Sequence, residues 1–371
     1  MTVLLITTTW LFTLYALWVM KMISLWSRPS ETPTPIHSSS HLSLIIPYRN
    51  EAQHLPNLLA ALSIQLKQTP GAALLFVDDH STDESNKLIQ AFAATHANSV
   101  MLSQRESHGK KQGIDLAISS TKTPWIITLD ADVIPCDGWL SRIASWTHEN
   151  ASDLLILPLH IGPSNSIVGR LQEVEFASVM GVTAGMALLK RPILCNGANM
   201  CFQREAYLRV RDERADMHIT SGDDLFLLHA LIPHQNIAWV HDPQVRVSTA
   251  PQSSWSTLVA QRLRWMGKTS SISNRNLTAT AWLTFLTNGV WIVCAFLTLF
   301  NRFPFAFFAG ISILKIVLDG WLIVKVGRWM CIKRLKRFYL ALVFLYPFYA
   351  TLFPLISQLV KPTWKGRPTT I

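Results

Sequence analysis

The chain has 371 residues, enough for one enzymatic domain of ordinary size together with membrane segments. Hydrophobic residues make up 49% of it, and charged residues make up 15%, well below the roughly 25% of a soluble domain. The net charge is +10, but the basic residues flank apolar segments and form no patch with interleaved aromatic residues, which argues against nucleic-acid binding. The five cysteines lack CxxC spacing, so we expect reduced thiols and no zinc site.

The chain begins with an apolar run that carries no charge over residues 3–20 and is followed by Lys21 and Arg28. A cleaved signal peptide carries its positive charge before the apolar run, so we expect a retained membrane anchor over 1–26. The positive charge after the run predicts that its C-terminal end faces the cytosol. A short polar linker is expected at 27–41.

Between residues 42 and 276, short apolar runs alternate with helical periodicity, which is typical of a mostly parallel sheet covered by helices. Ser81 and Glu84 in STDE predict a capping box at the start of one of these helices. An amphipathic helix with basic and aromatic residues is expected at the membrane interface over about 253–270. The expected strands are 42–47, 73–79, 99–102 and 125–130, with helices over 57–66 and about 110–120.

The C-terminal region, 277–371, contains three more apolar segments near the length of a membrane span, at about 280–300, about 304–326 and about 338–360. The basic cluster GRWMCIKRLKR between the last two predicts a cytosolic loop.

The last of these segments contains Pro347 and Pro354, and a basic tail, KPTWKGR, follows it. Those two features favour a re-entrant or interfacial segment over a full span. In the segment before it, Lys315 and Asp319 are four residues apart, so they pair on one helix face or line an acceptor path.

Acidic residues follow two of the expected strands at the point where each strand ends. Asp78 and Asp79 end one strand, and Asp130 and Asp132 end another. Ligands of open α/β sheets bind outside the carboxyl ends of the strands, so both pairs are placed at a binding edge. Asp130 and Asp132 can face one Mg²⁺ or Mn²⁺ ion that clamps a diphosphate, although most such pairs are solvated turns. Asp78 and Asp79 can hold a nucleobase or ribose, or can simply favour the start of a helix.

A third acidic pair, Asp223 and Asp224, follows Gly222, which permits a tight turn before an apolar helix. Capping needs only one acid, so the second carboxylate is available as a general base toward an acceptor hydroxyl.

The segment QRLRW places Gln261, Arg264 and Trp265 on one helix face. Such an arginine can bind a diphosphate, and the indole can form a platform for a sugar ring. An amphipathic helix at the membrane surface explains the same residues without a ligand, and the two interpretations are compatible.

Together these segments resemble the family 2 glycosyltransferases, the inverting group that includes cellulose synthase, hyaluronan synthase and ceramide glucosyltransferase. The resemblance covers about 42–268 and runs in family order. It rests on LIIPYRNEAQHLPNLLAAL, VDDHSTDES, HGKKQGIDLAI, LDAD, CNGANMCF, GDD and QRLRW. It implies an α/β GT-A domain over 42–276, between N-terminal and C-terminal transmembrane helices, and a single inverting displacement at the anomeric carbon.

The resemblance also implies roles for individual residues. Asp132, with Asp130, holds the metal ion, and Asp224 is the base, with Asp223 in place of the glutamate of the family. The acceptor side is formed by Asn196, Gly197, Ala198 and Asn199. The donor site is formed by Pro47, Glu51, Asp78, Asp79, Lys110, Asp130, Gln261, Arg264 and Trp265.

The expected function is therefore transfer of a sugar from a UDP-sugar to a lipid or membrane-embedded acceptor, with Mg²⁺ or Mn²⁺. The catalytic domain is expected on the cytosolic side of a bacterial inner or plasma membrane. Three C-terminal segments are few for a polymer channel, which favours a lipid acceptor over processive synthesis of an extracellular polysaccharide. An inactive homologue acting as a membrane scaffold is disfavoured by the three acidic pairs, and a nucleotidyltransferase leaves QRLRW without a role.

Overall fold

The computed structural model describes residues 1–30, 32–104, 109–212, 222–270, 272–333 and 335–359, together with 363–364 and 367–368. The chain divides into two compact units. The sheet unit contains residues 29–161 and 194–250, and the helical unit contains residues 1–28, 162–193 and the described residues from 251 onward. The chain thus leaves the sheet unit for a 32-residue segment and returns to it.

The sheet unit is built on a seven-stranded sheet with the order β3-β2-β1-β4-β8-β6-β9. The strands β3, β2, β1 and β4 are parallel, β8 is antiparallel to both of its neighbours, and β6 and β9 are parallel. All residues of β1 and β4 are buried, which agrees with the continuous apolar runs typical of parallel strands. The strands are β1 (Leu42–Tyr48), β2 (Ala73–Asp78), β3 (Ser99–Ser103), β4 (Trp125–Leu129), β6 (Leu154–Ile156), β8 (Asn199–Gln203) and β9 (Ile237–Trp239).

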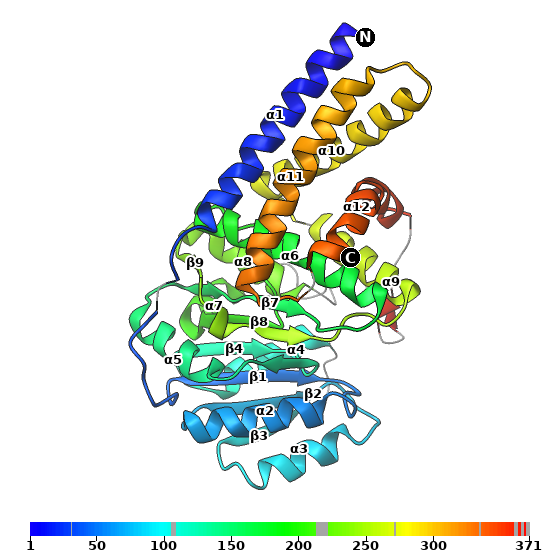
Figure 1. Cartoon of the computed structure of the whole chain (residues 1–371). Coiled ribbons are helices and arrows are strands. Elements are labelled where there is room, and N and C mark those ends of the chain that lie inside the picture. Colours follow the sequence, from blue (N-terminus) through cyan, green and yellow to red (C-terminus); the bar gives the residue numbers. More distant parts are fainter. Residues whose placement is uncertain are drawn as a thin grey trace. The chain divides into compact units, whose positions relative to one another are not determined.

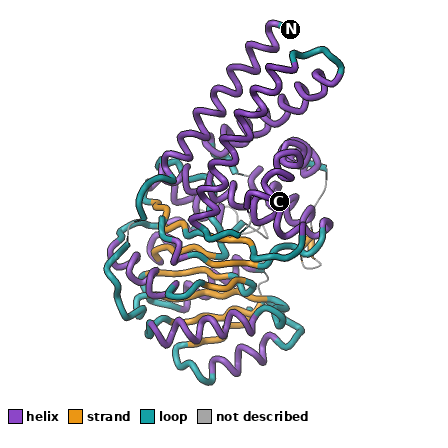
Figure 2. Tube along the Cα trace, viewed as in Figure 1, coloured by secondary structure: helices purple, strands orange, loops and turns teal. Residues whose placement is uncertain are grey.

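Helices run along the strands of this sheet (Figure 2). They bury Trp139 completely, and Phe76 and Phe202 of the strands are also fully buried. The helices are α2 (Leu55–Gln68), α3 (Ser85–Ala93), α4 (Lys110–Ser120), α5 (Trp139–Glu149), α7 (Arg204–Arg211) and α8 (Asp223–Leu231), with short 3₁₀ turns η1 (Ile232–His234) and η2 (Pro243–Val245).

A second, three-stranded sheet has the order β5-β10-β7, with bounds β5 (Val133–Pro135), β10 (Val247–Thr249) and β7 (Leu159–Ile161). Strand β5 is antiparallel to β10, and β7 is parallel to it. Because β5 starts at the residue after Asp132, this small sheet fixes the backbone that leaves the predicted metal site.

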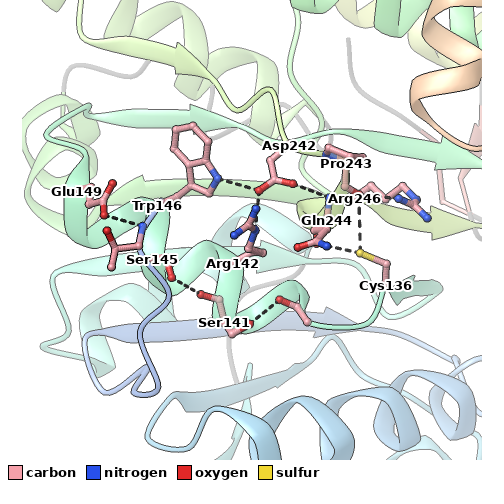
Figure 3. A network of polar contacts seen from close by, with 12 residues as sticks. Cys136, Ser141, Arg142, Ser145, Trp146, Glu149, Asp242, Pro243, Gln244 and Arg246 are labelled. Carbon is pink, nitrogen blue, oxygen red and sulfur yellow. Dashed lines mark hydrogen bonds and ion pairs between the residues drawn. The ribbon is translucent and has the colours of Figure 1, made fainter. Parts of the chain in front are cut away.

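A buried polar network holds the chain that leads into β10 against α5 (Figure 3). The Asp242 carboxylate accepts hydrogen bonds from Arg142 Nε at 2.8 Å, from Trp146 Nε1 at 3.3 Å and from the backbone N–H of Gln244 at 2.9 Å. Buried carboxylates are tolerated when they are paired and hydrogen-bonded in this way, so Asp242 has a structural role.

The helical unit contains four helices that are long and apolar enough to cross a membrane. They are α1 (Thr2–Leu25), α10 (Arg275–Leu299), α11 (Phe305–Trp329) and residues 338–357 of α12 (Leu335–Ser357). Helices α1, α10 and α11 run side by side (Figure 1). Large apolar side chains such as Trp10, Leu299 and Phe305 are exposed on these helices, as expected for faces that contact lipid. The remaining elements are α6 (Ile167–Leu188), α9 (Trp255–Ser270) and the two-residue strands β11 (Thr363–Trp364) and β12 (Arg367–Pro368).

Most of the predicted elements are confirmed, and the capping box is wrong. Helix α3 begins at Ser85 with Glu84 as its N-cap residue. The Ser81 hydroxyl instead accepts a hydrogen bond from the backbone N–H of Asn50, so it is engaged in the loop that follows β1. The expected pair of Lys315 and Asp319 is present, and Tyr15 Oη donates a further hydrogen bond of 2.7 Å to Asp319.

Helix α12 is continuous through Pro347 and Pro354, and its direction stays a prediction. Several parts of the predicted segments lie outside the described residues, among them His108, Arg334 and most of the basic tail. The segment 162–193, which the sequence placed inside the 42–276 domain, forms α6 of the helical unit, where Trp26 Nε1 donates a 2.9 Å hydrogen bond to Gly181 O.

Candidate active site

The first two acidic pairs lie at the same edge of the main sheet. Strands β2, β1 and β4 are parallel neighbours, so their carboxyl ends coincide. Asp78 is the last residue of β2, and Asp130 directly follows β4. Pro47 is the penultimate residue of β1, and Glu51 follows in the loop after that strand. The predicted binding edge is therefore formed.

The carboxylates of Asp78 and Asp79 shape the loop after β2. Asp78 accepts hydrogen bonds from the backbone N–H of Ser81 at 2.9 Å and from Asn86 Nδ2 at 3.2 Å. Asp79, which is 3% exposed, accepts a 3.1 Å hydrogen bond from the N–H of Gly109 and lies 3.8 Å from Arg49 Nη1. Asp78 thus stabilises the turn, and Asp79 links the turn to the start of α4.

Lys110, the first residue of α4, joins two of the acidic pairs. Its Nζ lies 2.7 Å from Asp130 Oδ1 and 3.4 Å from Asp223 Oδ2. Burial disfavours the charged form of this lysine, but Asp130, Asp223 and Asp224 outweigh that effect and raise the pKa of its ammonium. Lys110 is therefore a permanent cation among carboxylates that are far apart in the sequence.

Asp132 lies in a crowded acidic environment. Burial, together with the charges of Asp130 and Glu51, raises the pKa of Asp132 to about 6. Glu51 Oε2 is itself 2.7 Å from His54 Nδ1. A carboxylate whose charge is disfavoured by its neighbours is a fitting ligand for an added divalent cation, since the cation removes that repulsion.

The part of the chain that the structure describes contains no cluster of three or more His, Cys, Asp or Glu side chains arranged to hold a metal ion. Such a cluster is not required for Mg²⁺, which commonly uses one or two protein carboxylates and completes its shell with water and substrate phosphates. Asp130 and Asp132 fit such a site.

Asp224 is held in place by the backbone around it. Gly222 adopts a φ of +88°, which starts α8 at Asp223 as predicted. Asp224 Oδ2 accepts a 2.9 Å hydrogen bond from the N–H of Gly197, and Oδ1 accepts one of 2.8 Å from the N–H of Leu225. These bonds fix the carboxylate while leaving each oxygen further lone pairs.

Glycine is required at position 197 because neighbouring side chains approach its backbone closely. A Cβ atom at this position would lie 3.0 Å from Asp223 Oδ2, 3.2 Å from Asp224 Cβ and 3.3 Å from Lys110 Nζ. Ala198 is buried beside it, and its N–H donates to Asn196 Oδ1 at 3.0 Å. The glycine therefore lets the Asn196–Ala198 turn lie directly against the acidic pair.

The amide of Asn199 is engaged in the core. Its Nδ2 donates to Pro158 O at 2.8 Å and to Val245 O at 2.9 Å, and its Oδ1 accepts from Trp139 Nε1 at 3.3 Å. The residue is fully buried. Asn199 of the predicted acceptor segment therefore supports the turn that carries Gly197.

Gln261, Arg264 and Trp265 lie on α9 of the helical unit. The Trp265 ring packs against Phe176, with the ring centroids 5.9 Å apart. Burial lowers the pKa of Arg264, a shift that a bound anion would oppose. The sequence analysis assigned no role to Arg262, which contacts Gln261 and Trp265, because nothing in the sequence distinguishes its position within QRLRW from that of a surface residue.

Comparisons with known proteins show which proteins this chain resembles. Residues 43–210 match the family described as "Glycosyl transferase family 2". An undecaprenyl-phosphate 4-deoxy-4-formamido-L-arabinose transferase of Pseudomonas fluorescens is 33% identical over 103 residues, 27% of this chain and 29% of that protein. Glycosyltransferase AglE of Haloferax volcanii is 27% identical over 114 residues, 31% of this chain and 38% of that protein. These matches thus span well under half of either relative.

Among solved structures, the mannosyltransferase PcManGT of Pyrobaculum calidifontis, in complex with GDP-Man and Mn²⁺, is similar over 95% of this chain and 98% of that chain. Its TM-score is 0.60 at 14% sequence identity, which establishes a shared fold. The α/β fold with a mostly parallel sheet and flanking apolar helices is therefore confirmed. Residues 43–210 are thus similar to the family 2 glycosyltransferases, and the chain shares the GT-A fold of a known glycosyltransferase.

Proposed function

We propose that this protein is a membrane-attached, inverting glycosyltransferase that uses a divalent cation to move a sugar from a UDP-sugar to a lipid or other membrane-embedded acceptor. The observation that carries the proposal is the contact of Lys110 with both Asp130 and Asp223, beside the fixed carboxylate of Asp224. A leaving-group site and a candidate base are thus within reach of one another, as a single displacement requires.

Asp130 and Asp132 are the residues that would hold Mg²⁺ or Mn²⁺. When bound, the metal ion neutralises charge on the departing diphosphate. Lys110 contributes positive charge at the same place, because its ammonium already contacts Asp130.

Asp224 is the proposed general base. Its carboxylate accepts backbone hydrogen bonds from Gly197 and Leu225, so its direction is set before an acceptor arrives. An acceptor hydroxyl that donates to the remaining lone pair on Oδ1 or Oδ2 would pass its proton to Asp224 as it attacks the anomeric carbon.

The donor and acceptor classes follow from resemblance. UDP-sugars are the expected donors of the group to which the motifs are similar, whereas PcManGT was solved with GDP-Man, so both nucleotides belong in the test. The name of the Pseudomonas relative includes a polyprenyl phosphate, which favours a lipid acceptor. Four apolar helices suit attachment to a membrane, and we propose a bacterial inner membrane with the sheet unit in the cytosol.

The test is release of nucleoside diphosphate by detergent-purified protein with Mn²⁺ and total membrane lipid. UDP-glucose, UDP-galactose, UDP-N-acetylglucosamine and GDP-mannose are each offered as donors. We expect lipid-dependent turnover with one donor, and a loss of about 100-fold or more in Asp132→Ala and Asp224→Asn. Glu84→Gln, a change at an exposed carboxylate of the same unit, is the matched control and should retain full activity.

A thin-layer plate then separates the acceptor classes. One discrete glycolipid supports the lipid acceptor, and material that stays at the origin and grows with time supports a processive synthase. Turnover that survives both Asp132→Ala and Asp224→Asn would show that the assigned site is not the active site.

A further inference from the structure

Arg262 occupies the second position of QRLRW, between the residues to which the family resemblance assigns roles. It is only 2% exposed, which is rare for an arginine unless its charge is compensated. The compensation comes from α6: Arg262 Nη2 donates to Glu175 Oε2, and both side chains are buried. This ion pair ties α9 to α6 within the helical unit.

The same guanidinium contacts both ends of the motif. Its Nη1 donates a 2.8 Å hydrogen bond to Gln261 Oε1. Its Cζ lies 4.3 Å from the centroid of the Trp265 ring, in the range of a cation–π contact. Trp265 also packs against Phe176, the residue after Glu175 on α6.

These contacts decide which way the Gln261 amide is turned. A guanidinium has donors only, so the amide atom that faces it has to be the oxygen. The amide nitrogen is then the end that offers protons to a ligand, and the ligand atoms it suits are oxygens of a phosphate or of a sugar hydroxyl. Without Arg262 the amide can rotate and present its oxygen, which repels phosphate.

We propose that Arg262, anchored by Glu175, is a positioning residue that holds the amide of Gln261 and the indole of Trp265 in the orientation that binds a nucleoside-diphosphate sugar. This inference rests on the glycosyltransferase function proposed above. It assigns Glu175 and Arg262 an effect on donor affinity in addition to their effect on the packing of α6 and α9.

The first test is Arg262→Lys. Lysine keeps the positive charge that Glu175 requires, but it lacks the planar fork that reaches Gln261 and covers the Trp265 ring. We expect the KM for the donor to rise about 10-fold, kcat to change less, and the melting temperature to fall by only a few degrees. Arg170→Lys is the matched control, because Arg170 pairs with Glu173 on α6 and should leave the donor KM unchanged.

A double-mutant cycle tests whether Arg262 affects the donor KM through Gln261. If Arg262 acts through Gln261, then Arg262→Lys should add little to the donor KM of Gln261→Leu. If Arg262→Lys unfolds, Glu175→Gln replaces it in the same cycle, since glutamine removes the charge that anchors Arg262 and keeps the size of the side chain.

The outcomes separate this inference from the function on which it rests. Active wild-type protein with an unchanged donor KM in Arg262→Lys would overturn the positioning role and leave the function intact. Additive effects of Arg262→Lys and Gln261→Leu would also overturn it. Wild-type protein that releases no nucleoside diphosphate from any donor would overturn the proposed function itself.

Discussion

The acidic site of the sheet unit and the ion pairs of the helical unit differ in how their charges are compensated. In the sheet unit, the carboxylates of Asp130, Asp223 and Asp224 gather around the ammonium of Lys110, and Asp132 lies beside Asp130 and Glu51. The helical unit contains buried or half-buried pairs of opposite sign, Glu175 with Arg262 and Lys315 with Asp319. The first arrangement has an excess of negative charge, and the second is neutral.

This difference is the one expected between the proposed binding groups and the groups that stabilise the fold. An excess of carboxylates destabilises the unit that contains it and becomes favourable only when a cation binds, which is how binding sites trade stability for activity. A neutral buried pair gives little net stability, but the loss of one partner is costly because the other is left as an uncompensated buried charge. We therefore expect removal of one charge to have opposite effects on stability at the acidic site and in the neutral pairs.

The largest stability effect is expected at Lys315. Lys315→Met removes the partner of Asp319 inside α11, and we expect a loss of about 3–5 kcal/mol in the free energy of unfolding. The double variant Lys315→Met/Asp319→Leu should recover most of that loss, since it leaves no buried charge. Thermal unfolding in detergent measures both, with Lys87→Met at an exposed pair as the control that should not change. A double variant no more stable than the single one would contradict the comparison.

The next largest effect on stability is expected at Asn199. Asn199→Ala removes three buried hydrogen bonds, to Pro158, Val245 and Trp139, and should lower the free energy of unfolding by about 2–4 kcal/mol. Because the amide is turned into the core, the folded fraction should keep the wild-type KM for the acceptor. A raised acceptor KM in protein of unchanged melting temperature would instead place Asn199 at the acceptor.

The sequence predicted the elements whose signal is local. Continuous apolar runs identified β1, β2 and β4, and four long apolar segments identified the helices that can cross a membrane. The acidic edge was predictable because parallel strands bring their carboxyl ends together. The predicted capping box is wrong because the Ser81 hydroxyl accepts a hydrogen bond from the N–H of Asn50. Asn50 is 31 residues away, so no local sequence pattern indicates this partner.

Pairings between distant segments were the part that could not be predicted. Glu175 and Arg262 are 87 residues apart, and neither stands out in its own segment. The same holds for α6, which the sequence placed in the sheet unit although it packs with the apolar helices. Hydrophobic periodicity predicts which face of an element is buried, but it does not predict which other element covers that face.

A smaller effect is expected from His160 when the pH is lowered. Burial, with a further contribution from Arg246, lowers the pKa of His160 to about 4. The unfolded chain therefore binds a proton on this residue below about pH 6.5 while the folded chain does not, so stability falls as the pH drops from about 6.5 toward 4. His160→Asn should reduce the loss of melting temperature between pH 7.5 and 5, and an unchanged loss would exclude His160 as its source.

The smallest expected effect has the opposite sign and tests the comparison most directly. Asp132→Asn removes one charge from the crowded acidic group without changing its shape, so in the presence of a chelator the melting temperature should stay constant or rise by a degree or two. Added Mn²⁺ should then raise the melting temperature of the wild type more than that of the variant, because only the wild type has the full set of carboxylates to bind it. A clear drop in the melting temperature of Asp132→Asn would mean that Asp132 holds the fold as Asp242 does, and the contrast between the two units would fail at the residue on which the proposed chemistry depends.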